Sequence, residues 1–297
     1  MSDSDLEDIT YSRTDTIAAV SDYYKFLTTM YMDDSQVVYP PTGGWPSIVN
    51  ADPDVLKLLG KSDEVLTLLA HLPYIRCPGN WTSDADAAPM CLFADWPKLI
   101  EMLTKDPTAA EFIRVETEGD LGKLEVPHVI GLASGPYDNP IMVLDTEFGI
   151  IHWQECPFEI LKEYGESSVP YEWDDNVDEK EAEWREEAAP WAIPDFFEIL
   201  KDQFKKLDWI PISPRSVRGP GTLGLNEEAI LARLRDIYRQ QSWPDLAVYD
   251  KTTCLEAVDR ALAESYPSNV CIRRRGRLMP DPSLSTNGAE STPAASS

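Results

Sequence analysis

The chain has 297 residues, 43% of them hydrophobic, with 9 Trp, 12 Tyr and 8 Phe, which is enough apolar material for a sizeable core. Its 52 acidic and 26 basic residues leave a formal net charge of −26. Because this charge repels nucleic-acid phosphates, it argues against general DNA or RNA binding and leaves two explanations, solubility or a protein partner with a basic surface.

The N-terminal sequence and the cysteines bear on localisation. Residues 1–8 are acidic and contain no hydrophobic region, so no signal peptide is predicted, and no stretch reaches the ~18 consecutive apolar residues of a membrane span. The five cysteines are scattered without close pairs. This pattern indicates a reducing compartment, the cytoplasm or the nucleus, in which the thiols act mostly as small buried apolar groups.

The N-terminal part is predicted to be mainly helical. Residues 1–14 are expected to be disordered, and a helix capped by Asp15 is predicted to run to about Met32, because its apolar residues recur every three or four positions. Ser62 is predicted to cap a second helix that ends at Leu72. A third helix is expected to open at Asp95, with a proline in its first turn.

Two tryptophans lie outside these predicted helices. Trp45 belongs to the turn-rich segment 40–46, where it either presents a platform to a ligand or fills the edge of the core; the packing role is favoured. Trp81 lies in the irregular segment 74–89. We nevertheless place both side chains on the predicted binding surface.

The segment from Ile141 to Trp153 is the predicted centre of the fold. Two apolar, β-branched runs flank a polar stretch that ends in Gly149, which is typical of a β-hairpin with one residue at positive φ. Both runs are almost continuously apolar, so the hairpin is expected in mid-sheet with both faces covered. Further strands are predicted at 112–116 and 126–132, and a short one at 90–93. This order favours an α+β fold with an antiparallel meander sheet packed by helices.

An acidic segment follows the hairpin. Residues 172–187 contain nine acidic residues against only Lys180 and Arg185, which indicates a solvated insertion or a poorly ordered helix. Trp173 and Trp184 are expected to tether it to the body. The carboxylates that we assign to partner binding are Glu179, Glu181, Glu183, Glu186 and Glu187.

The remaining chain is divided by composition. We predict one α+β body over 15–212, closed by a helix that starts at Asp195, and a Gly/Pro-rich linker over 213–225. A helical hairpin over 226–278 is too short to bury its apolar face alone and is expected to dock on the body. Residues 279–297 are predicted to be a disordered tail.

Motifs for catalysis or cofactor binding are sparse. His152 and Cys156 are four residues apart and His128 lies on a neighbouring predicted strand, but Pro157 disfavours the helical geometry that would direct them to one metal ion. No Cys–His pairing is favoured for a thiol nucleophile, and no nucleotide-binding loop is present. Asp145 and Glu147 are the carboxylate pair to inspect, although loop carboxylates commonly satisfy turn backbone. We therefore expect no catalytic residue, no metal and no cofactor.

Three stretches carry a resemblance to known proteins. Tyr39-Pro-Pro-Thr-Gly-Gly-Trp-Pro, Asp145-Thr-Glu-Phe-Gly-Ile-Ile-His-Trp and Trp191-Ala-Ile-Pro-Asp-Phe-Phe-Glu-Ile-Leu together resemble a group of uncharacterised proteins from filamentous fungi. The order of elements is more distantly similar to the SUKH superfamily, which includes a fungal regulator of cell-wall synthesis and bacterial toxin-immunity proteins. That resemblance implies function by protein contact and brings no catalytic residues, while the acidic insertion departs from the pattern.

The sequence thus favours a non-enzymatic, intracellular interaction or regulatory protein. The alternative is an enzyme or accessory protein of fungal secondary metabolism, with a pocket lined by His128, His152 and Cys156. A third possibility, a subunit of an obligate complex, would show a large exposed apolar patch. The oligomeric state is left open, as is the role of the basic cluster 273–277, which either neutralises the acidic body or serves in nuclear targeting or in docking on 172–187.

Overall fold

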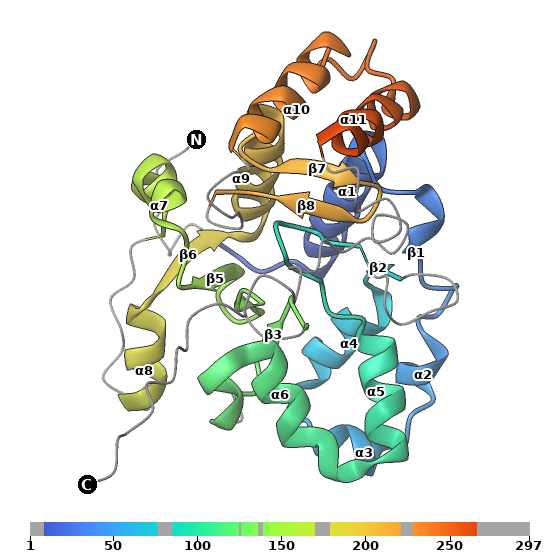
Figure 1. The fold of residues 1–297 in the computed structure, drawn as a ribbon. Coiled ribbons are helices and arrows are strands. Elements are labelled where there is room, and N and C mark those ends of the chain that lie inside the picture. Colours follow the sequence, from blue (N-terminus) through green and yellow to red (C-terminus); the bar gives the residue numbers. More distant parts are fainter. Residues whose placement is uncertain are drawn as a thin grey trace, which may run out of the picture.

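The computed structural model describes residues 9–76, 85–124, 126–135, 139–169, 179–220 and 228–265. A four-stranded antiparallel sheet lies at the centre, in the order β3-β4-β5-β6 (Figure 1). Its strands are β3 Val129–Gly131, β4 Met142–Asp145, β5 Ile150–Gln154 and β6 Ala188–Ala192. The predicted hairpin forms the two inner strands, and every residue of β4 is buried. The α+β class and the meander are therefore confirmed.

The two faces of the sheet bury different material. Side chains alternate between faces along a strand, so Leu144 and Trp153 lie on one face and Val143 and His152 on the other. The first face joins the main core, where Trp153 packs on Phe196 of α9. The second face carries a smaller apolar cluster and several polar groups. Buried polar groups need hydrogen-bond partners, and on the second face Asp145, His152 and Arg185 are all buried.

Helices cover the first face. α1 (Arg13–Met30) packs along α9 (Ile193–Lys206), where the ring centroids of Tyr23 and Phe197 are 5.4 Å apart. Ser12 caps α1 by accepting a hydrogen bond from the backbone of Asp15, so the predicted cap at Asp15 is wrong by three residues. α9 begins two residues before the predicted start, because Pro194 fits its first turn.

The other helices and short strands complete the shell seen in Figure 1. They are η2 Asp34–Gln36, β1 Val37–Val38, α2 Pro46–Val49, α3 Pro53–Lys57, α4 Asp63–His71, β2 Tyr74–Ile75, α5 Trp96–Lys105, η3 Pro107–Ala109, α6 Ala110–Glu118, η4 Gly119–Lys123, α7 Phe158–Tyr164, η5 Gly165–Ser167 and α8 Glu179–Glu186. Ser62 caps α4, as predicted, by accepting a hydrogen bond from Val65. Asp95 precedes α5 but makes no capping bond; its carboxylate instead binds Arg76, with distances of 2.6 and 2.7 Å.

Two strand predictions are wrong. Residues 112–116 lie within α6, where Ile113 and Thr117 are buried one turn apart while Phe112 faces solvent. A short apolar run does not by itself distinguish a buried strand from a helix, and here the i, i+4 spacing decides. The segment 90–93 makes only isolated bridges, Cys91 with Ala88 and Phe93 with Ala133.

The N-terminal segment is placed by the hairpin turn. Gly149 has φ 72°, and a Cβ there would lie 2.9 Å from the backbone nitrogen of Tyr11. Glycine is therefore required both by the turn and by the chain that crosses it. Residues 9–14, expected to be disordered, are ordered by this crossing and by the Ser12 cap, whereas residues 1–8 lie outside the described residues.

The C-terminal helices pack on the body. β7 (Ile210–Ser213) and β8 (Ser216–Arg218) form an antiparallel ribbon, and β8 lies within the stretch 213–225 predicted to be a linker. Above this ribbon, α10 (Glu228–Gln240) and α11 (Lys251–Ser265) form the predicted helical hairpin (Figure 1). The tail 279–297 and the basic cluster 273–277 lie outside the described residues. Among the described helices, none is long and apolar enough to cross a membrane.

Candidate functional site

The second face of the sheet is organised around the turn between β4 and β5. Asp145 ends β4 with no exposed surface, and its Oδ1 accepts hydrogen bonds from the backbone N–H groups of Glu147 (2.8 Å) and Phe148 (3.1 Å). This bonding is the usual role of aspartate in a tight turn, and it confirms that role for Asp145. The second oxygen, Oδ2, remains available to a partner outside the turn.

That partner is Arg185 of α8. Its Nη1 donates to Asp145 Oδ2 at 2.7 Å and to His152 Nε2 at 2.9 Å. Its Nη2 donates to His128 Nε2 at 3.0 Å and to Glu181 Oε1 at 2.7 Å, and its Nε donates to the same Glu181 oxygen at 2.9 Å. Each of the five guanidinium N–H groups therefore has an acceptor. We call these five residues, His128, Asp145, His152, Glu181 and Arg185, the Arg185 cluster.

The electrostatics of the cluster follow from burial and charge. Burial alone would lower the pKa of Arg185, but the carboxylates of Asp145 and Glu181 outweigh it and raise that pKa above its usual value. For His152, burial is the larger cause and the charge of Arg185 adds to it, so its pKa falls to about 3. The cluster thus contains a permanent cation, two carboxylates and a neutral buried imidazole.

Apolar contacts complete the attachment of α8. Trp184, next to Arg185, is buried with Leu121 of η4 and with Val143 of the sheet. Its ring meets that of His152 edge-on, with centroids 5.6 Å apart. The guanidinium carbon of Arg185 lies 5.7 Å from the centre of the Phe148 ring. The predicted tether through Trp184 is therefore present, while Trp173 lies outside the described residues.

The predicted acidic residues fall on both sides of α8. Glu181 turns inward to Arg185, whereas Glu183, Glu186 and Glu187 are exposed. Glu187 also accepts a hydrogen bond from Gln154 of β5 at 3.2 Å. Glu179 begins the helix. The structure thus separates one carboxylate that anchors the helix from three that face solvent.

Trp45, one of the two predicted tryptophans, does not join this surface. The Trp45 indole N–H donates to the carbonyl of Leu72 at 2.8 Å, and its ring packs between Tyr74 and the guanidinium of Arg76. These contacts correspond to the favoured packing role. α2, which Trp45 directly precedes, lies on the opposite side of Figure 1 from α8. Trp81 lies outside the described residues.

The alternative catalytic set is only partly assembled. Arg185 brings His128 and His152 together, but both nitrogens that face it are occupied as acceptors. Burial raises the pKa of the Cys156 thiol to about 12, which is the opposite of what a thiol nucleophile requires. Within the described residues, no group of three or more His, Cys, Asp or Glu side chains is arranged to hold a metal ion.

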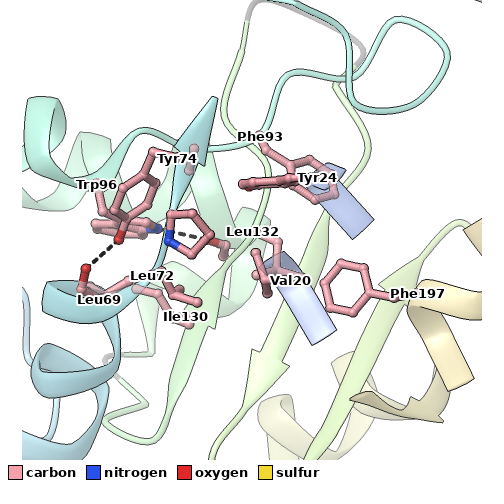
Figure 2. Close-up of a pocket in the computed structure, with 13 residues that line it drawn as sticks. Val20, Tyr24, Leu69, Leu72, Tyr74, Phe93, Trp96, Ile130, Leu132 and Phe197 are labelled. Atoms are coloured by element: carbon pink, nitrogen blue, oxygen red, sulfur yellow. Dashed lines mark hydrogen bonds between the residues drawn. The ribbon is translucent and has the colours of Figure 1, made fainter. Parts of the chain in front are cut away.

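A cavity in the main core lies on the other face of the sheet. Its volume is about 20 Å³, room for roughly one water molecule, and its walls are apolar side chains of α1, α4, β2, β3 and α9 (Figure 2). The Tyr74 hydroxyl and the Trp96 indole N–H donate hydrogen bonds to the carbonyls of Leu69 and Gly131. None of His128, His152 or Cys156 lines this cavity, so it does not provide the pocket of the alternative.

No protein-family model, curated protein or solved structure matches this chain. The similarity to uncharacterised fungal proteins and to the SUKH superfamily therefore stays a prediction.

Proposed function

We propose that the chain is a non-enzymatic interaction or regulatory protein that binds a basic protein surface through the outer face of α8. The observation that carries the proposal is the Arg185 cluster. A stretch that served only solubility would need no anchor, whereas α8 is fixed by a buried cation with five hydrogen bonds and by a buried tryptophan.

The anchor fixes how the helix displays its charges. With Glu181, Trp184 and Arg185 facing the sheet, the exposed carboxylates of Glu183, Glu186 and Glu187 are held beside the edge strand β6. Fixed charges of one sign accelerate association with an oppositely charged surface and discriminate against wrong partners. The partner class that fits is a protein with a Lys- or Arg-rich face.

A cytoplasmic or nuclear location is part of the proposal. The cysteines Cys91, Cys156 and Cys254 are all free and buried, as is typical of a protein from a reducing compartment. The resemblance to the SUKH superfamily predicted from the sequence favours the same class of function, because members of that superfamily act by protein contact.

The test is affinity capture from the source organism with a charge-neutralised variant. We expect Glu183→Gln/Glu186→Gln/Glu187→Gln to lose most of the captured basic partner, because the attraction is electrostatic, and to keep its melting temperature within a few degrees. The control is Glu101→Gln/Glu111→Gln/Glu256→Gln, which removes the same number of exposed charges from α5, α6 and α11.

The two variants separate a local surface from overall charge. Equal capture by wild type and the α8 variant would exclude this face as the binding surface. Equal loss in both variants would show that net charge, rather than α8, attracts the partner. Glu181→Gln belongs to a different class, because it removes a negative charge that pairs with the buried Arg185 and is expected to lower stability.

A further inference from the structure

The Arg185 cluster dictates the protonation state of two histidines. A guanidinium can only donate hydrogen bonds, so the Nε2 atoms of His128 and His152, 3.0 and 2.9 Å from it, must be unprotonated. A second proton on either ring would place its Nε2–H against an N–H of Arg185, and it would place a positively charged imidazole against the positively charged guanidinium. Docking of α8 through Arg185 and protonation of these rings are therefore opposed.

The two histidines differ in how their surroundings compensate a charge. The side chain of His128 is 23% exposed and lies near Asp145 (3.6 Å), Glu147 (3.3 Å) and Glu181 (4.0 Å). Three carboxylates thus face His128 and would offset its charge.

His152 has no such compensation. It is only 1% exposed, and its Nδ1 has no hydrogen-bond partner among the residues that the structure describes. The charged groups that face it are Arg185 from α8 and Asp145 from β4, which itself is bound to Arg185. The other neighbours are the ring of Trp184, the His128 imidazole and Pro190, the residue opposite on β6. Of the two rings, His152 is the one that cannot be protonated in place.

We propose that α8 is a pH-dependent latch: His152 takes up a proton only when Arg185 leaves, so acidification releases α8 from the sheet. The exposed carboxylates of Glu183, Glu186 and Glu187 are then no longer held in a fixed arrangement. The release itself stands on the contacts of the Arg185 cluster. Its consequence for partner binding rests on the proposed function.

The size of the effect follows from proton linkage. With α8 docked, burial and Arg185 hold the pKa of His152 at about 3, and with α8 released we expect it to return to the ordinary imidazole value of about 6.5. The released state therefore binds more protons between these values and gains population as the pH falls. Lowering the pH from about 7.5 to about 5 should raise the population of released α8 roughly 30-fold.

Hydrogen–deuterium exchange of peptides that cover residues 179–187 measures the release directly. After correction for the pH dependence of chemical exchange, wild-type α8 should lose protection roughly 30-fold between the two pH values. His152→Gln keeps an acceptor for Arg185 but cannot be protonated, and its α8 should keep nearly constant protection. His128→Gln is the matched control: because it keeps His152, its α8 should still lose protection as the pH falls.

Two results would overturn the latch: unchanged protection of wild-type α8 at about pH 5, or the same loss in His152→Gln as in wild type. Should His152→Gln not fold, NMR titration of the three histidine rings replaces it. The His152 ring must then titrate together with the loss of α8 protection, and independent titration contradicts the proposal.

None of these measurements uses a partner. If α8 keeps constant protection while partner capture depends on the α8 charges, the latch is excluded and the proposed function stands. If α8 loses protection at low pH while capture does not depend on these charges, the latch stands and the proposed function is excluded.

Discussion

Lys61 and Arg185 are both buried cations, and they are satisfied in different ways. Arg185 distributes its donors over two carboxylates and two imidazoles. Lys61, whose side chain has no exposed surface, lies 2.8 Å from each oxygen of the equally buried Glu118 and donates to the carbonyl of Val126 at 3.1 Å. Burial raises the pKa of Glu118 despite the opposing charge of Lys61. A buried pair of this kind contributes little net stability, but removing one partner leaves an uncompensated charge.

We expect Lys61→Met to lower the free energy of unfolding by about 3–5 kcal/mol at neutral pH, because Glu118 loses its buried counter-ion. The pKa of Glu118 in the folded variant rises further above its unfolded value, so folded-state stability is retained at low pH and lost as the pH rises through that pKa. The deficit against wild type should therefore shrink when urea unfolding is measured at about pH 5 rather than at about pH 8. Lys61→Met/Glu118→Gln, which removes both charges, should show no such pH dependence, and a pH-independent deficit in the single variant would contradict this account.

At the same scale, Asp145 could be placed from sequence and Arg185 could not. An aspartate before a turn that ends in glycine has a local role, and the local sequence predicts it. The partners of Arg185 come from β4, β5, the segment before β3 and α8 itself, so they meet only in the fold. The available signal was an arginine beside a tryptophan within an acidic run, four residues after Glu181. That pattern indicates an anchored helix but does not identify the sheet residues.

At the scale of elements, the sequence predicted the central hairpin and the helix that Ser62 caps, and it failed where a short segment packs against a neighbour. α6 is such a case, because its contact with β3 needs no side chain at Gly131. A Cβ on Gly131 would lie 2.0 Å from the carbonyl oxygen of Thr117, and the Gly131 carbonyl accepts the Trp96 indole N–H at 3.0 Å. A glycine inside a strand marks close backbone approach, but it does not tell which element approaches.

Gly131→Ala should therefore destabilise the fold by about 3 kcal/mol or more, because the backbone of α6 at Thr117 and the backbone of β3 must move apart to admit one methyl group. Gly165→Ala is the matched control, because a Cβ there meets nothing within 4 Å. Urea denaturation followed by circular dichroism compares the two variants. Wild-type stability for Gly131→Ala would mean that α6 does not lie directly on β3.

At the scale of the whole molecule, the C-terminal helical hairpin raises the question of whether it unfolds separately. Its contacts with the body are buried or partly buried and reach from α1 to β7. The hydroxyl of Tyr238 donates to Pro211 at 2.9 Å, the indole of Trp243 to Phe204 at 2.9 Å and the hydroxyl of Tyr249 to Met30 at 2.7 Å. Composition predicted a linker before this pair because Pro and Gly are frequent there, yet part of that stretch is the β7–β8 ribbon on which the pair rests.

These contacts make α10 and α11 part of one cooperative unit, and Leu234→Ala tests this. Leu234 of α10 has no exposed surface, so truncation should cost about 2–5 kcal/mol through lost burial and the cavity left behind. Because the pair and the body share the interface, the whole loss should appear as a shift of one unfolding transition, seen alike by far-ultraviolet circular dichroism and tryptophan fluorescence. Leu246→Ala, at a leucine that is 51% exposed between the two helices, should leave the midpoint almost unchanged. Two separate transitions in Leu234→Ala, with only helical signal lost in the first, would instead make the pair an independently unfolding domain.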